Sequence, residues 1–188
     1  MPKIILMMSV SLDGFFETAS RDISWHLVDD ELLHHLNDQF RTMGAFIFGR
    51  VTHELMAGYW PTAGQDPNLS GPMSEFAGIW GGMPKFVFSR TLGQLGGNTR
   101  VVHDVMPGQI AELKAQSRGD IALSGANLAS SFMRHGLIDE FRILVHPVVL
   151  GRGRPLFESP DVRMNLTLKG TRTFGSGVVL LHYATDGA

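Results

Sequence analysis

Three apolar runs in this sequence each end in residue types that bind phosphate. They are Phe48-Gly49-Arg50-Val51-Thr52, Phe88-Ser89-Arg90-Thr91 and Leu123-Ser124-Gly125-Ala126-Asn127. A glycine before a helix lets an anion approach the unpaired backbone amides of the first turn, arginine can hold a phosphate with two hydrogen bonds, and hydroxyl side chains add short donors. Taken singly, each feature is more typical of a turn, a solvated charge or a helix cap. Their combination predicts a cleft for a ligand with several phosphates.

The alternation of strands and helices indicates where these three segments lie. Short apolar runs predict strands, and runs with apolar residues on one helical face, closed by glycine, predict helices. The predicted strands are Lys3–Leu12, Ala45–Phe48, Lys85–Ser89, Val101–Val102 and Ile121–Ser124. The predicted helices are Asp29–Met43, a short helix from Gly49 to about Met56, one that follows Pro107, and Leu128–His135. Because an open parallel sheet binds ligands beyond the carboxyl ends of its strands, we expect all three segments at one cleft.

The C-terminal part of the chain has a different pattern. The predicted strands Glu140–Leu150, Arg163–Leu168 and Val178–Tyr183 have no helical pattern between them, and Gly175-Ser176-Gly177 predicts a hairpin turn. The segment Pro61–Pro72 is rich in Gly, Pro, Asn and Ser, which predicts a surface loop. We therefore expect a single domain over residues 1–188, with an α/β fold whose mostly parallel sheet ends in antiparallel strands.

Composition argues against several classes of function. The 188 residues include 16 basic and 18 acidic side chains with a net charge of −2 and no block of Lys or Arg, so we expect no nucleic-acid partner. No apolar stretch reaches the length of about 18 residues that a membrane span needs. The chain has no cysteine, which excludes disulfides and Cys-bound zinc and fits a cytoplasmic protein. His34-His35 and His53-Glu54 lack a further ligand at a useful spacing, so no metal site is predicted.

Five motifs occur in an order that resembles a known family. They are Ser11-Leu12-Asp13-Gly14-Phe15, Phe48-Gly49-Arg50-Val51-Thr52-His53-Glu54, Lys85-Phe86-Val87-Phe88-Ser89-Arg90-Thr91-Leu92, Ser124-Gly125-Ala126-Asn127-Leu128, and Leu137-Ile138-Asp139-Glu140-Phe141 continuing to His146-Pro147-Val148-Val149-Leu150-Gly151. The set spans nearly the whole chain and resembles the dihydrofolate reductase-like superfamily, most closely the branch related to the reductase domain of the riboflavin-biosynthesis deaminase-reductase. The resemblance implies a three-layer fold with a mostly parallel mixed sheet of about eight strands, an antiparallel hairpin at its end and helices on both faces. It also implies NADPH as the cofactor.

The resemblance assigns cofactor-binding roles to two of the strand ends. Gly49, Arg50 and Thr52 match the family's phosphate-binding turn from strand to helix, with Arg50 near the adenosine 2′-phosphate or the pyrophosphate. The family's adenosine-side segment is matched by Ser89, Arg90 and Thr91. A positive group at that position favours NADPH over NADH.

Two further segments match the family's turns around the nicotinamide half of the cofactor. The glycine turn under the pyrophosphate and nicotinamide ribose is matched by Ser124, Gly125, Ala126, Asn127 and Leu128. Relatives commonly have Gly-Gly where this chain has Ser-Gly, and Ser124 permits the same approach if its φ is negative. The loop that would border the nicotinamide is Leu12, Asp13 and Gly14.

A proton donor is also expected, because hydride transfer to a C=N or C=O bond leaves a charge that a proton must neutralise. The segment Trp25-His26-Leu27-Val28-Asp29-Asp30-Glu31 contains the candidates. In folate-reducing relatives a carboxylate opens the helix, and this resemblance points to Asp30 as the catalytic residue. Helical geometry places Asp30 and His34 one turn apart on a face beside the apolar stripe and leaves Asp29 as the N-cap. Trp25, Asp30 and His34 are therefore the predicted substrate-binding residues.

Structural alternatives stand beside these roles. The acids at the start of the helix can serve only to stabilise its positive N-terminus, and Trp25 can be a pocket wall or an ordinary core residue. His146-Pro147 is expected to serve in packing or in a dimer contact rather than in catalysis.

Three functions are consistent with these patterns. The first is a stand-alone NADPH-dependent reductase that acts on a small heterocyclic C=N or C=O substrate of riboflavin-precursor or pterin type. The second is a dihydrofolate reductase activity, and the third is a nucleotide-binding protein without catalysis. The deaminase half of the riboflavin enzyme needs a zinc site with a Pro-Cys-x-x-Cys segment, which a chain without cysteine cannot provide. Relatives also imply a homodimer, formed through the Arg142–Leu150 region.

Overall fold

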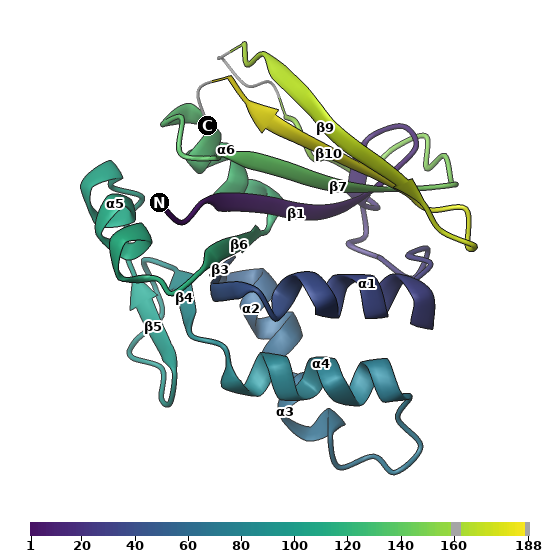
Figure 1. Ribbon diagram of the computed structural model, residues 1–188, viewed down its shortest axis with the longest axis horizontal. Coiled ribbons are helices and arrows are strands. Elements are labelled where there is room, and N and C mark those ends of the chain that lie inside the picture. The colour runs from purple at the N-terminus through teal and green to yellow at the C-terminus, as the bar shows by residue number, and fades with distance from the viewer. Residues whose placement is uncertain (159–162, 187–188) are drawn as a thin grey trace.

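The computed structural model describes residues 1–158 and 163–186 and contains one large sheet with helices on both faces (Figure 1). The strands of this sheet are β1 (Ile4–Ser11), β3 (Met43–Gly49), β4 (Lys85–Phe88), β5 (Thr99–Val102), β6 (Asp120–Ser124), β7 (Glu140–His146), β9 (Leu166–Thr173) and β10 (Val179–Thr185). The helices are α1 (Asp30–Phe40), α2 (Arg50–Ala57), α3 (Trp60–Ala63), α4 (Gly71–Gly82), α5 (Pro107–Gln116) and α6 (Ala126–Arg134). Two short strands, β2 (Phe15–Glu17) and β8 (Arg154–Pro155), pair with each other outside the large sheet.

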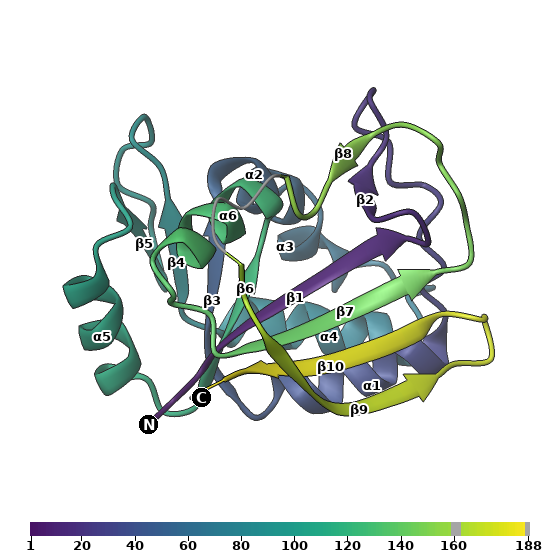
Figure 2. The same cartoon turned by 90° about the horizontal axis from the view of Figure 1, so that it is seen from above.

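The order of the strands explains how distant motifs meet. The sheet of 8 strands runs β5-β4-β3-β6-β1-β7-β10-β9 (Figure 2). The pairs from β5 to β7 are parallel, whereas β10 is antiparallel to both β7 and β9. The predicted mostly parallel sheet with an antiparallel hairpin at its end is therefore confirmed. The parallel order brings the carboxyl ends of β4, β3, β6 and β1 to the same edge.

Two apolar layers hold the helices to the sheet. On one face, Ile110 of α5 and Phe132 of α6 are buried against β1 and β6. On the other face, Leu33 of α1 and Trp80 of α4 pack against β3. Complete burial of a large apolar side chain such as Phe132 contributes about 1.5–3 kcal/mol. This burial fixes α6, and with α6 the glycine turn that precedes it.

Helix α1 begins where the sequence predicts. Asp29 is the N-cap, and its carboxylate accepts a hydrogen bond from the backbone N–H of Leu32 at 2.8 Å. Asp30 and Glu31 lie in the first turn, where negative charge stabilises the positive end of the helix. The assignment of Asp29 as the cap is thus confirmed.

The prediction of a surface loop over Pro61–Pro72 is wrong at both ends. Helix α3 occupies the first residues, and α4 begins at Gly71 with Ser70 as its cap. No helix is predicted from the sequence over α4, because four of its residues are glycine and its apolar residues do not form a clear stripe. Tertiary packing supplies the stability instead, since Phe76 and Trp80 are buried beside Phe46 of β3.

Several strand boundaries also differ from the prediction, and the largest differences are in the C-terminal part of the chain. The predicted strand Glu140–Leu150 ends at His146, because Pro147 has no N–H for the ladder. The predicted strand Arg163–Leu168 begins later, at Leu166, and continues to Thr173. Most of β9 is exposed, so burial imposes no clear apolar alternation on its sequence. The hairpin turn at Gly175-Ser176-Gly177 is confirmed, and Gly177 takes a positive φ of 83° there.

Candidate functional site

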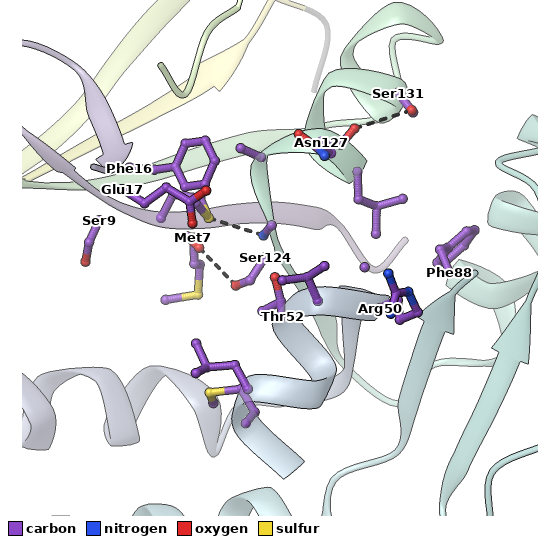
Figure 3. Close-up of a pocket in the computed structure, with 18 of the residues that line it drawn as sticks. Met7, Ser9, Phe16, Glu17, Arg50, Thr52, Phe88, Ser124, Asn127 and Ser131 are labelled. Atoms are coloured by element: carbon purple, nitrogen blue, oxygen red, sulfur yellow. Dashed lines mark hydrogen bonds between the residues drawn. The ribbon is translucent and has the colours of Figure 1, made fainter. Parts of the chain in front are cut away.

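A cleft of about 1730 Å³ opens at the carboxyl ends of β3, β4 and β6. The predicted cofactor-binding residues that line it are Gly49, Arg50, Thr52, Ser89, Arg90, Thr91, Ser124, Gly125, Ala126, Asn127 and Leu128. Figure 3 shows Thr52 and Ser124 close together in this cleft, with Arg50 further along toward Phe88. The parallel sheet therefore brings the three predicted phosphate-binding segments to a common cavity. We call this part of the cleft the cofactor lobe.

The glycine turn at the end of β6 has the geometry that only glycine adopts without strain. Gly125 has a φ of +107° and precedes α6 as its N-cap. A Cβ atom at this position would lie 2.9 Å from the side-chain oxygen of Thr52. Gly125 is thus required both by its backbone conformation and by the close approach of α2.

Ser124 stands where relatives commonly have another glycine. Its φ is not positive, since Arg21 is the one non-glycine residue with a positive φ in the described ranges. Its hydroxyl donates to the carbonyl oxygen of Met7 on β1 at 3.0 Å. The side chain is therefore satisfied within the sheet, and a role of Ser124 in cofactor binding stays a prediction.

The two arginines of the cofactor lobe are held by neighbouring carboxylates. Arg50 donates to both oxygens of Glu54, one turn along α2, at 3.1 and 3.2 Å. Arg90 donates from Nε and Nη2 to Asp104 at 2.8 and 2.6 Å, and its side chain is 82% exposed. Exposed pairs of this kind contribute at most about 1 kcal/mol, so either guanidinium can exchange its carboxylate for a phosphate at low cost.

Ser89 has a structural task in the same lobe. Its hydroxyl oxygen accepts hydrogen bonds from the backbone N–H groups of Thr91 and Leu92 at 3.2 and 3.1 Å. The carbonyl oxygen of Ser89 also lies 2.9 Å from Nδ1 of His103. These bonds fix the turn after β4 and hold Arg90 at the rim of the cleft.

The loop Leu12-Asp13-Gly14 does not line the cleft. The Asp13 carboxylate accepts from the Ser11 hydroxyl at 2.6 Å and from the N–H groups of Leu150 and Gly151 at 3.1 and 2.8 Å. The Ser11 hydrogen bond, followed by these backbone bonds, lowers the pKa of Asp13 below its usual value. Asp13 thus ties the β1–β2 turn to the loop after β7, and a role of Leu12–Gly14 beside the nicotinamide stays a prediction.

The predicted substrate-binding residues also lie outside the lining of the cleft. Asp30 is exposed and accepts a hydrogen bond from the Ser70 hydroxyl at 3.1 Å. His34 is exposed on α1. Trp25 packs edge-on against His26 and His146, with ring centres 4.3 and 5.5 Å away. The roles of Trp25, Asp30 and His34 in binding or catalysis remain predictions.

Tertiary structure adds residues that the sequence patterns do not indicate. Arg154 of β8 donates to Glu17 of β2 at 2.6 Å and to the side-chain oxygen of Asn127 at 2.8 Å. Its guanidinium also lies 5.1 Å from the ring centre of Phe16. Figure 3 shows Phe16 and Glu17 beside β1 in the cleft. No sequence motif links these residues, because they meet only through the pairing of β2 with β8.

The cleft continues between α1 and the sheet into an apolar region, which we call the α1 lobe. Its apolar lining residues are Leu33, Leu36, Phe40, Met56, Trp60, Phe76, Leu144 and Leu180. Polar groups are sparse there and include Ser9, His26 and Arg142. Arg142 donates to Gln39 at 2.7 Å and to Glu140 at 3.2 Å, while its Nε is buried without a hydrogen-bond partner.

Residues 1–158 and 163–186 contain no cluster of three or more His, Asp or Glu side chains placed to bind a metal ion. No helix within the same ranges is both long enough and apolar enough to cross a bilayer.

Comparisons with known proteins agree with this architecture. The family model of the RibD C-terminal domain matches residues 2–180. The uncharacterised protein YyaP of Bacillus subtilis (strain 168) is 35% identical over 186 residues, which is 98% of this chain and 96% of that protein.

Two solved structures share the fold. A Shewanella sp. PV-4 protein assigned by its name to riboflavin biosynthesis superimposes with a TM-score of 0.74 at 19% identity, over 97% of this chain and 98% of that one. The dihydrofolate reductase of Enterococcus faecalis, solved with NADP(H), gives a TM-score of 0.65 at 12% identity, over 98% and 96% of the two chains. The three-layer dihydrofolate reductase-like fold is therefore confirmed, and the chain belongs to the family of RibD C-terminal domains.

Proposed function

We propose that this protein is an NADPH-dependent reductase that transfers hydride to a small heterocyclic C=N or C=O substrate. The observation that supports this most directly is the continuity of the cleft. The cofactor lobe, with its three phosphate-binding strand ends, opens into an apolar α1 lobe of suitable chemistry for a flat ring. A reductase needs such an arrangement, because donor and acceptor must lie side by side with water excluded.

The residues of the cofactor lobe fit a dinucleotide with an additional phosphate. The absence of a Cβ at Gly125 leaves the first turn of α6 open to the pyrophosphate, and Thr52 offers a hydroxyl at the same point. Arg50 and Arg90 offer guanidinium groups for the 2′-phosphate. NADPH bound there would supply the hydride from its dihydronicotinamide ring. The chain's own task would be to hold the cofactor, orient the substrate and supply a proton.

The test of the cofactor is a fluorescence titration with NADPH and, in parallel, with NADH. We expect NADPH to bind at least about tenfold more tightly, since one buried or charge-assisted phosphate contact contributes about 1.5–3 kcal/mol. Binding of neither nucleotide would refute the proposal. Equal affinity for both would refute the part assigned to Arg50 and Arg90.

The test of the reaction is NADPH oxidation with a panel of dihydrofolate, riboflavin precursors and cyclic imines. Turnover of a member of the panel separates the reductase from a nucleotide-binding protein without catalysis. A preference for dihydrofolate would instead favour the second function, in which Asp30 assists protonation of the pterin. Asp30 lies outside the described lining, so we favour substrates other than dihydrofolate.

We further propose that the protein acts in the cytoplasm as a homodimer. Both edges of β7 are paired within the chain, so a contact through the Arg142–Leu150 region would use side chains and the loop after β7, where Val149 is 66% exposed. Light scattering gives the mass in solution, and a monomer would contradict the dimer.

A further inference from the structure

The proton donor of the proposed reaction must be sought among the titratable groups that line the cleft. The carboxylates in the described lining are Glu17 and Asp104. Glu17 is paired with Arg154 at 2.6 Å, and Asp104 with Arg90 at 2.6 Å. Each carboxylate anchors an arginine away from the α1 lobe, since Glu17 joins β2 to β8 and Asp104 follows β5 beside Arg90. Neither residue therefore suits the task.

Three histidines remain in the same lining. His103 bonds to the Ser89 carbonyl at the β4 and β5 edge, on the adenosine side of the cofactor lobe. His135 is exposed and follows the C-terminus of α6, at the end of the helix remote from Gly125. His26 is different, because it stacks on a residue at the carboxyl end of β7, beside the α1 lobe.

His26 is held in place by the buried residue His146. The two imidazole rings are stacked, with centres 5.1 Å apart and planes inclined by 19°. His146 is completely buried, and its Nδ1 accepts the backbone N–H of Leu27 at 3.0 Å. This bond fixes the segment that contains His26 against β7, at the level of Ser11, the last residue of β1. The ring of His26 is thus pre-positioned rather than free to rotate on the surface.

The stack leaves hydrogen-bonding capacity unused. Nε2 of His26 and Nε2 of His146 are both buried and have no hydrogen-bond partner in the structure. Because Nδ1 of His146 is an acceptor, the neutral ring keeps its proton on Nε2. An unsatisfied buried polar group costs about 1–3 kcal/mol, so each one in a folded protein needs an explanation, and a catalytic role is one.

We propose that His26 donates the proton that completes reduction of the substrate, and that His146 positions it. This inference rests on the proposed reductase function. The carbon of the C=N bond receives the hydride, with its two electrons, from NADPH, and the π electron pair moves to nitrogen. That nitrogen takes a proton from the His26 imidazolium to give the neutral amine. His26 is left as the neutral imidazole and regains a proton from water, and NADP⁺ leaves.

The charges around His26 set the pH at which it can act. Burial lowers its pKa below the ordinary 6.5, and the facing charge of Asp22 opposes this in part. From β7 the facing group is His146, whose pKa is lowered to about 4 by burial and then by the charge of His26. The protonated fraction of His26 therefore falls as the pH rises through a value below 6.5. The rate of a proton-dependent reduction should fall over the same range.

The experiment compares two substrates in the wild-type protein and in His26→Gln. One substrate is a neutral cyclic imine, assayed above the pKa of its own conjugate acid. The other is the corresponding N-methyl iminium salt, which accepts hydride without needing a proton. We expect His26→Gln to lower kcat for the neutral imine by about 100-fold and to leave the iminium rate within about twofold. NADPH affinity and the melting temperature report on the fold of the variant.

A second measurement does not depend on turnover. The ring of His26, identified by NMR as the signal lost in His26→Gln, should titrate below 6.5, and Asp22→Asn should move it lower still. A titration at or above 6.5 would contradict the buried environment of this ring.

The outcomes separate the two proposals. If the wild-type protein oxidises NADPH with neither compound and with no member of the panel, the reductase function is refuted. This inference about His26 is then refuted as well. Normal turnover of the imine by His26→Gln would refute only the role of His26. Equal loss with both substrates would show a structural role, and selective loss of imine turnover in Asp30→Asn instead would assign the proton to Asp30.

Discussion

The side chain of Thr52 lies in the space that a side chain on Gly125 would need, although the two residues belong to different strand-to-helix turns. A Cβ atom on Gly125 would lie 2.9 Å from Oγ1 of Thr52 and 3.7 Å from the backbone nitrogen of Gly49. The first turns of α2 and α6 therefore converge where β3 and β6 end side by side. Neither helix has a side-chain cap, so the amides of both first turns are available to the pyrophosphate in the proposed function.

Replacement of Gly125 by alanine should weaken both the fold and the cofactor site. Alanine at a φ of +107° costs about 1–2 kcal/mol, and its Cβ would press on Thr52. We expect a fall in melting temperature of roughly 2–8 °C and a loss of NADPH affinity of about tenfold. The control is Gly78→Ala, because Gly78 lies inside α4 and a Cβ added there would have nothing within 4 Å. An unchanged NADPH affinity in Gly125→Ala would contradict the site.

Replacement of Arg90 by glutamine should reduce discrimination between the two nucleotides. The guanidinium loses only an exposed pair with Asp104 in the unliganded protein, so the fold should be unaffected. NADPH affinity should fall about tenfold, whereas NADH affinity should change less than twofold. Arg100→Gln is the matched control, since Arg100 lies on the neighbouring strand β5 and outside this cleft. Equal losses for both nucleotides would show that Arg90 does not contact the 2′-phosphate.

Glu140 should make the protein sensitive to strong acid. Burial by itself raises the pKa of Glu140, but hydrogen bonds and charge from Lys3 and His182 outweigh it and lower the pKa from 4.5 to about 2. Because the pKa of Glu140 is lower in the folded protein than in the unfolded chain, its contribution to the free energy of unfolding is present above pH 4.5. This contribution is lost as the pH falls toward 2. Urea unfolding should show this loss in the wild type and not in Glu140→Gln. At pH 7 the variant should be less stable by about 1.5–3 kcal/mol, because the hydrogen bonds that Lys3 and His182 make to the charged carboxylate are weakened.

His146 should cause a separate loss of stability at milder acidity. Burial, followed by the charge of His26, lowers the pKa of His146 from 6.5 to about 4. As the pH falls below 6.5, His146 becomes protonated in the unfolded chain but stays neutral in the folded protein. The free energy of unfolding is therefore at its full value above pH 6.5 and declines as the pH falls toward 4. His146→Gln should make this decline shallower in urea unfolding experiments, while His26, His35 and His53, whose pKa values burial also lowers, keep their own part of it. A decline of the same size in the variant would assign the effect to another group.

Much of the local structure can be predicted from the sequence because it depends on neighbours along the chain. Asp29 caps α1 as predicted, because a short polar side chain directly before an apolar helical stripe is typical of an N-cap. The ends of the strands at Gly49 and Gly125 can likewise be predicted, because an apolar run is followed by glycine at each of them. Helix α4 cannot be predicted from its sequence, because its glycines disfavour a helix. The burial of Phe76 and Trp80 stabilises this helix instead.

The sequence by itself determined which residue types stand at the ends of the strands and which ligand chemistry they favour. Only the tertiary structure decided which of these residues share a cavity. Arg90 and Gly125 line one cleft because parallel strands align their carboxyl ends, whereas Asp30 binds Ser70 outside it. His26 stacks on His146, which is far from it in the sequence, and no local sequence pattern predicts this contact. The reason is physical: periodicity reports the geometry of one element, but distances between elements follow from how their buried faces pack.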